Sequence, residues 1–316
     1  MKKYFFSMVA LLILGAIVFG AGYVLYDRSD NKVFGQYLEY SETEYAVQGE
    51  IEAIDFTLIG DYNIILQRGE IGSLSYSQSE ISDITVTEEN GILTLNEKID
   101  WKNQVKKWYC RRQKTDLILT LPEENKLTVK CNFASNVSIA LPDWEFGDID
   151  LKISGKTDVS SNSLKSGDVN LDVSGFASVN LNGEFQNVFI KTSGMSEIEL
   201  NGSANAIDIK SSGTMSFDSE DIICPRIDVK ASGTAKMNIV GEGDSLSAKV
   251  SGYCKITAEK FSLNTLNLDA SGSVNMTVSV KDEINASASG SIKVSYYGDP
   301  KITRSGSGSN NFEKIG

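Results

Sequence analysis

The second half of the chain repeats a pattern of apolar and polar positions about every twenty residues, and each repeat contains a Ser-Gly pair. Successive pairs are 18 to 20 residues apart. Such self-similarity is typical of repeat proteins, in which every repeat forms one structural unit and packs on its neighbours. The pairs are Ser154-Gly155, Ser174-Gly175, Ser193-Gly194, Ser212-Gly213, Ser232-Gly233, Ser251-Gly252, Ser271-Gly272 and Ser289-Gly290.

Alignment of the repeats on the glycine places apolar residues in the same positions throughout. The positions four residues before and four residues after the glycine are apolar in every repeat, and mostly polar residues lie between the apolar ones. Apolar residues two apart are typical of a half-buried strand. Each repeat is therefore predicted to form a short strand, a Ser-Gly corner, a second short strand and a turn. The position six residues before the glycine is occupied by Ile149, Val169, Val188, Ile207, Ile227, Leu246, Leu266 and Ile284.

A single repeat of this kind cannot bury its apolar face. Parallel stacking of the repeats, about 4.8 Å apart, joins the apolar positions into one continuous core. We therefore predict an all-β fold, a single-stranded β-solenoid (β-helix), with regular rungs over residues 148–304. The glycine is explained by a positive φ at the corner or by close approach of neighbouring backbones. The serine is interpreted as a corner residue whose hydroxyl hydrogen-bonds to nearby backbone.

The remaining segments are less regular. Residues 47–147 alternate in shorter runs, with a hairpin signal at Glu89-Asn90-Gly91, and are predicted to be an irregular β section that caps the solenoid. Residues 27–46 are polar with scattered aromatic residues, which indicates a juxtamembrane linker. Residues 305–316 are interpreted as a loose C-terminal tail.

The N-terminus predicts the location of the protein. Lys2 and Lys3 precede an uncharged apolar run over residues 4–26. At about 1.5 Å per residue a helix of this length spans roughly 35 Å, enough to cross a hydrocarbon core of about 30 Å. Because the positive residues lie at the N-terminus, residues 1–26 are predicted to be a single-pass membrane anchor and the rest of the chain extracytoplasmic. A signal peptide that is cleaved near Gly20-Ala21-Gly22 remains an alternative.

Composition and charge exclude several classes of function. The chain has no histidine, so a Ser-His-Asp triad, a Cys-His pair and a histidine zinc site are all excluded. The formal net charge of −12 argues against nucleic acid as a partner. We expect no cofactor, no metal and no catalytic residue.

Two basic features are candidates for an interaction surface. Three residues before the glycine, four successive repeats carry a lysine: Lys191, Lys210, Lys230 and Lys249. Asp172 and Asp269 flank this row, and Asp208 and Asp228 precede its central members by two residues. The row is interpreted either as a binding face for an anionic envelope polymer or as a solvated face whose like charges are relieved by the neighbouring aspartates.

The second basic feature is the segment over residues 101–114 (WKNQVKKWYCRRQK), which reverses the local charge of an acidic chain. Such a segment suits lipid headgroups, teichoic-acid phosphates or an acidic membrane-protein partner, and a solvated hairpin excursion is the alternative. Its candidate residues are Lys102, Lys106, Lys107, Trp108, Arg111 and Arg112.

The four cysteines leave the disulfide state open. An extracytoplasmic location permits disulfides, and Cys110 and Cys131 are about one repeat apart. Cys131 and Cys254 fall in inward positions, where a free cysteine behaves as a small apolar residue. Cys224 precedes Pro225 in a predicted turn.

The chain resembles bacterial families described as adhesins or auto-transporter adhesin heads with β-strand repeats. The resemblance is carried by residues 60–66 (GDYNIIL), 89–93 (ENGIL), the Ser-Gly repeats and residues 297–300 (YGDP), and covers nearly everything from residue 47 onward. It implies a right-handed, single-stranded β-helix on the cell envelope and brings no catalytic residues.

The leading hypothesis is a membrane-anchored, non-enzymatic protein of the cell envelope that binds or senses a component at the surface. A polysaccharide-active enzyme on a β-helix is one alternative, although such enzymes usually build a cleft from long loops, which these tight repeats lack. An accessory protein of an envelope-stress signalling system is another.

Overall fold

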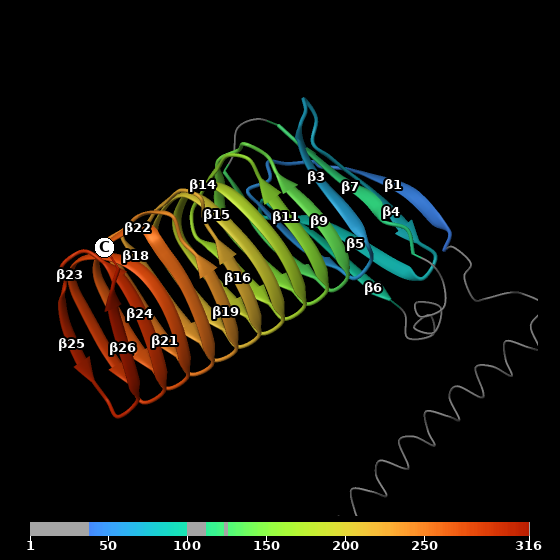
Figure 1. Ribbon diagram of the computed structural model, residues 1–316. Helices are drawn as coiled ribbons and strands as arrows, with labels where there is room; N and C mark the ends of the chain where they lie inside the picture. Colours follow the sequence, from blue (N-terminus) through green and yellow to red (C-terminus); the bar gives the residue numbers. More distant parts are fainter. Residues whose placement is uncertain (1–37, 100–111, 123–125, 316) are drawn as a thin grey trace, which may run out of the picture.

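The computed structural model describes residues 38–99, 112–122 and 126–315, and all regular secondary structure in these ranges is β-strand. Figure 1 shows the strands stacked into an elongated rod that ends at the C-terminus. The predicted anchor over residues 1–26 lies outside the described residues. Within the described ranges no helix is long and apolar enough to cross a membrane.

The regular part of the rod has three faces, which we name by their position relative to the Ser-Gly corner. The first face precedes the corner and the second follows it. The third is short and leads from the second face of one rung to the first face of the next.

The strands divide among these faces. Four long strands pass through more than one face: β14 (Phe176–Thr192), β15 (Met195–Ser211), β22 (Tyr253–Ala270) and β23 (Ser273–Ala288). The first face also contains β10 (Phe146–Ile153), β13 (Val169–Val173), β18 (Arg226–Ala231), β21 (Ser245–Val250) and β25 (Lys301–Ser305). The second contains β9 (Asn136–Leu141), β11 (Lys156–Ser161), β16 (Thr214–Asp218), β19 (Thr234–Asn238), β24 (Ser291–Tyr297) and β26 (Ser309–Lys314). The third contains β12 (Leu164–Ser166), β17 (Ile222–Ile223) and β20 (Gly241–Glu242).

Neighbouring rungs pair in parallel with the register that the glycine alignment predicts. Ile207 lies opposite Val188 in one neighbouring rung and opposite Ile227 in the other. All three side chains are buried, and the same column continues through Leu246, Leu266 and Ile284. The predicted β-solenoid and its continuous aliphatic core are therefore confirmed, whereas the right-handed coil stays a prediction.

The structure decides between the two explanations for the corner glycines. A Cβ atom on Gly213 would lie 2.0 Å from the carbonyl oxygen of Gly194 in the preceding rung, far inside van der Waals contact. The Ser-Gly corner glycines are not among the residues with positive φ. Close approach of stacked backbones, and not a left-handed conformation, therefore requires glycine here. The serines act as expected, since Ser174 Oγ donates to the carbonyl of Ile153 and Ser212 Oγ to that of Thr192, both over 3.4 Å.

The N-terminal section stacks its rungs out of sequence order. The rung made by β2 (Ala53–Leu58) and β3 (Tyr62–Arg68) lies between two others that follow it in the chain. One of these is formed by β6 (Ile92–Ile99) and β7 (Thr115–Leu121), the other by β8 (Leu127–Phe133) and β9. Strands β1 (Tyr40–Ala46), β4 (Ser73–Ser79) and β5 (Ser82–Glu89) pair antiparallel and cover the end of the rod. The predicted hairpin at Asn90-Gly91 is confirmed, because both residues have positive φ and join β5 to β6.

The structure differs from the sequence interpretation at both ends of the described chain. The last residues of the expected linker form β1, which pairs with β4, and its Tyr45 packs against the core. The expected tail contains β26, which pairs in parallel with β24. The physical reason is that Ser307-Gly308 forms a further corner, where a Cβ on Gly308 would lie 2.2 Å from the carbonyl oxygen of Gly290.

The last rung carries polar residues in two inward columns. Arg304 continues the column of Ala286, and Asn310 continues the column of Ile292. The Arg304 guanidinium carbon lies 4.6 Å from the centre of the Phe312 ring. Inward-facing charges of this kind discourage edge-to-edge pairing of exposed strands, so the rung ends the apolar core.

Candidate binding surface

The structure brings the four predicted lysines together in one row. Lys191, Lys210, Lys230 and Lys249, hereafter the lysine row, lie on β14, β15, β18 and β21, each directly opposite the next in register. They alternate with inward, mostly apolar residues that are buried, so all four point outward from the first face and are exposed. Stacked strands place neighbouring members about 4.8 Å apart.

Ion pairs close the two ends of the lysine row. Lys191 Nζ lies 2.8 Å from Asp172 Oδ2, and Lys249 Nζ lies 3.2 Å from Asp269 Oδ2. The flanking aspartates predicted from the sequence therefore do contact the terminal lysines.

The central lysines have a different environment from the one expected. Asp208 and Asp228, which precede them by two residues, pair instead with Arg226, whose Nη2 and Nε lie 3.7 Å and 3.4 Å from the two carboxylates. In the part of the chain that the structure describes, Lys210 and Lys230 make no ion pair. Direct contact between aspartate and lysine is therefore found only at the ends of the row, because a nearby guanidinium pairs with both central carboxylates.

A groove runs beside the lysine row, between it and the Ser-Gly corner. Its volume is about 460 Å³. The four lysines and Asp269 form one side, and corner serines from successive rungs form the other: Ser193, Ser212, Ser232, Ser251 and Ser271. The groove thus follows the axis of the rod and offers ammonium groups along one side and serine residues along the other.

A second charged column, on the border of the third face, has the opposite organisation. Lys126, Glu145, Lys165 and Glu184, hereafter the charge ladder, alternate in sign from rung to rung. Lys126 Nζ lies 2.5 Å from Glu145 Oε1, and Lys165 Nζ lies 3.1 Å from Glu184 Oε2. Glu145 and Lys165 are themselves joined by a β-bridge. This column neutralises its own charges, which the lysine row does not.

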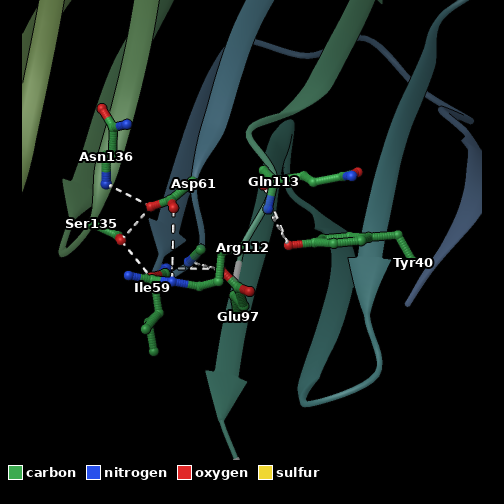
Figure 2. A network of polar contacts seen from close by, with 9 residues as sticks. Tyr40, Ile59, Asp61, Glu97, Arg112, Gln113, Ser135 and Asn136 are labelled. Carbon is green, nitrogen blue, oxygen red and sulfur yellow. Dashed lines mark hydrogen bonds and ion pairs between the residues drawn. The ribbon is translucent and has the colours of Figure 1, made fainter. Parts of the chain in front are cut away.

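Most of the second predicted surface, Lys102, Lys106, Lys107, Trp108 and Arg111, lies outside the described residues. Arg112 is described, and Figure 2 shows it inside a polar network rather than on an open surface. Its Nη1 donates to Ser135 Oγ over 2.9 Å, and its Nε lies 3.7 Å from Asp61 Oδ2. Asp61 Oδ1 in turn accepts hydrogen bonds from the Ser135 hydroxyl and the Asn136 amide. Arg112 therefore holds neighbouring rungs together.

Glu97 is a buried carboxylate that the sequence interpretation did not single out. It follows Asn96, which lies opposite Thr57, and so occupies an inward column. Its Oε2 accepts hydrogen bonds from the amides of Ile59 and Gly60 over 2.8 Å and 2.7 Å. In the regular rungs a backbone carbonyl accepts the corresponding hydrogen bonds. The Thr192 carbonyl, for example, accepts from the amides of Ser212 and Gly213. The sequence signal is a glutamate in an otherwise apolar column.

That carboxylate also affects a neighbouring phenol. Burial, followed by the nearby Glu97 carboxylate, raises the pKa of Tyr62 well above its usual range. Both influences favour the protonated phenol. Both groups serve the packing of the N-terminal rungs.

The described cysteines are free and buried thiols: Cys131, Cys224 and Cys254. Burial raises the pKa of Cys224 and of Cys254 to about 11. Cys110 lies outside the described residues. Among the described residues no three or more Cys, Asp or Glu side chains come together as a metal site.

These features define, for the described residues, an elongated β-solenoid whose first face carries a row of four lysines with carboxylate partners only at its two ends. Residues 55–240 and 189–300 match the family described as "Putative auto-transporter adhesin, head GIN domain". The chain belongs to this family, as the sequence resemblance implies. A comparison with curated proteins finds no match.

Several solved structures are similar to the chain. A putative adhesin from Parabacteroides merdae has 12% identity and a TM-score of 0.43, with 88% of this chain and 97% of that one covered. A putative adhesin from Bacteroides fragilis has 16% identity and a TM-score of 0.31, with the same coverage. A putative lipid binding protein from Parabacteroides distasonis has 16% identity and a TM-score of 0.37, again over 88% and 97%.

Proposed function

We propose that this chain is an adhesion-like, non-enzymatic surface protein of the bacterial envelope that binds anionic polymers along the lysine row. In this proposal residues 1–26 anchor it in the cell membrane and the solenoid is extracytoplasmic. The family description supports a role at the surface. The observation that carries the binding function is the lysine row itself, whose two central members have no carboxylate partner among the described residues.

The lysine row places like charges directly opposite each other on neighbouring strands. Side chains directly opposite each other on neighbouring strands interact, and like charges there are destabilising. The charge ladder shows that the same fold accommodates alternating charges. A polyanion that lies along the rod supplies the missing negative charge at Lys210 and Lys230 simultaneously. It meets a lysine about every 4.8 Å.

The non-enzymatic part of the proposal has its own support. Glu97 is the one buried carboxylate among the described residues, and two backbone amides occupy its Oε2 atom. With its Oε2 held by these amides, Glu97 is not free to act as one of the paired acids that glycoside cleavage needs. The alternative role as an accessory to envelope-stress signalling depends on residues 101–111, which lie outside the described residues.

Binding of two linear polyanions to the full-length protein tests the proposal. The probes are a decamer of galacturonic acid, which carries carboxylates, and inorganic polyphosphate of ten units. The test variant is Lys210→Ala/Lys230→Ala. The control is Lys236→Ala/Lys255→Ala, which removes an exposed lysine pair that is also in register but lies on the second face.

We expect wild-type binding of at least one probe, with an affinity about tenfold lower in the test variant, since two exposed charge contacts supply roughly 1.4 kcal/mol. The control is expected to stay within about twofold of wild type. Because surface charges are screened, binding should weaken as salt is raised. Equal losses in the two double variants, or no binding of either probe by the wild type, would contradict the proposed function.

A further inference from the structure

A second hollow lies on the other side of the lysine row, away from the corner serines. Its volume is about 440 Å³. Lys191 and Lys210 border both this hollow and the corner groove, so the two spaces are separated by the row itself. The feature that distinguishes the second hollow is an aromatic side chain, Phe189, and we call it the Phe189 hollow.

Phe189 stands in an outward column of β14 in which the neighbouring rungs carry polar residues. It lies opposite Asn170 on one side and Asp208 on the other. Lys191 follows it by two residues in the same strand and therefore points outward beside it. The side chain is 37% exposed. A single exposed apolar residue is ordinary, but this ring lies in a hollow bordered by lysines and carboxylates.

From this arrangement we propose that the ligand of the lysine row is an acidic glycan, and that one pyranose ring of it packs on Phe189. The C–H groups on one face of a pyranose form an apolar surface that suits the face of an aromatic ring. Hydroxyl groups at the edge of the sugar donate to Asp208 and Asp172, and the acidic substituent pairs with Lys191 or Lys210. This inference rests on the proposed function and assigns the class of polymer.

The carboxylates favour a glycan over a polyphosphate. Asp172 and Asp208 each have a basic partner, in Lys191 and Arg226, but a carboxylate has about four acceptor positions and these pairs leave some of them open. Sugar hydroxyls are donors and fill such positions. A polyphosphate has no apolar face, so it gains nothing from the Phe189 ring. At neutral pH its oxygens offer almost no hydrogen-bond donors, so the Asp208 carboxylate repels it.

The test compares the same two probes, decagalacturonate and ten-unit polyphosphate, on the full-length protein with single substitutions of Phe189. Phe189→Ala removes the ring, and Phe189→Tyr keeps it. Met195→Ala is the matched control, because Met195 is a 54% exposed apolar residue of the next long strand, β15, on the second face beyond the corner. Thermal unfolding of each variant checks that the fold is unchanged.

We expect Phe189→Ala to weaken decagalacturonate binding about fivefold to tenfold, in the upper part of the range of an aromatic stacking contact, and to leave polyphosphate binding within about twofold. Phe189→Tyr and Met195→Ala should both stay within about twofold of wild type for the glycan.

The possible failures are distinguishable. If polyphosphate binds through the lysine row while decagalacturonate does not bind, or if Phe189→Ala leaves glycan binding unchanged, the glycan assignment is wrong and the proposed function stands. Equal losses for both probes in Phe189→Ala would also overturn the assignment, because the ring would then not distinguish a sugar from a phosphate chain. If neither probe binds the wild type, the proposed function fails together with the assignment.

Discussion

The charge ladder and the lysine row occupy successive parts of the same solenoid, share only strand β14, and treat charge in opposite ways. In the charge ladder each lysine stands next to a glutamate, and ion pairs of 2.5 Å and 3.1 Å join them. In the lysine row four lysines stand side by side, and the aspartates nearest its centre are paired with Arg226. Stacking of the rungs therefore does not itself impose like charges. A surface with unpaired like charges, such as the lysine row, is a better candidate for binding a charged ligand than a surface whose charges pair with each other, such as the charge ladder.

The largest expected effect comes from breaking the register on which both columns depend. In Gly213→Ala the new Cβ would lie 2.0 Å from the carbonyl oxygen of Gly194, and a stacked backbone cannot move aside as a side chain does. We expect a loss of about 3 kcal/mol or more in the free energy of unfolding, measured by denaturant titration. Gly167→Ala is the control, because its Cβ mainly meets the movable side chain of Asp148, and should cost about 1 kcal/mol. Similar losses in both variants would show that backbone approach at the corner is not the constraint.

The interior provides a second contrast, because burial in an apolar inward column disfavours a charge that water stabilises on the lysine row. Burial raises the pKa of Cys254 to about 11, above the value of about 8.5 for an unfolded thiol. The unfolded chain therefore loses this proton first as pH rises, and stability falls. Below about pH 8 both states keep the proton and the group has no effect.

Denaturant unfolding under reducing conditions at several pH values between about 8 and 10 measures this fall. Each buried thiol contributes at most about 1.4 kcal/mol per pH unit in the upper part of this range. Cys254→Ala, whose neighbours in the column include Ala235, should have a shallower slope than wild type. Identical slopes would mean that the thiol is not the group that titrates.

A smaller effect is expected when the charge ladder is converted into a copy of the lysine row. Glu145→Lys removes the partner of Lys126 and places three lysines in consecutive rungs. Because all these side chains are exposed, we expect the free energy of unfolding to fall by only about 1 kcal/mol, and the difference to shrink at high salt. Thermal unfolding at low and high ionic strength measures it. A salt-independent change would point to packing instead of charge.

The regular rungs and the lysine row could be predicted because the Ser-Gly spacing sets the register. Once the glycines are aligned, Lys210 must lie between Lys191 and Lys230. Ser307-Gly308 follows Ser289-Gly290 by 18 residues and so also fits the repeat spacing. The interpretation of residues 305–316 as a tail overlooked this last rung.

Other features could not be read from a local pattern. The insertion of the β2–β3 rung between two later rungs is a long-range relation, and no period in residues 47–147 reports it. The buried role of Glu97 follows from that order, since its carboxylate serves amides 37 and 38 residues away. The pairing of Arg226 with Asp208 and Asp228 depends on how far the arginine side chain extends. The column alignment does not report this, so it gave no sign that Lys210 and Lys230 lack an ion-pair partner among the described residues.

The most direct test of the central claim is thermal unfolding of Lys210→Glu with and without decagalacturonate. If the lysine row is kept for a ligand at a cost in stability, this variant relieves two of its three like-charge neighbour pairs, because the new carboxylate lies opposite both Lys191 and Lys230. Its free energy of unfolding without ligand should rise by about 0.5 kcal/mol, while the ligand should no longer raise its Tm. The wild type should unfold earlier alone and gain in Tm when the ligand is added. A variant that is no more stable than wild type, and that keeps the full gain from the ligand, would contradict the account.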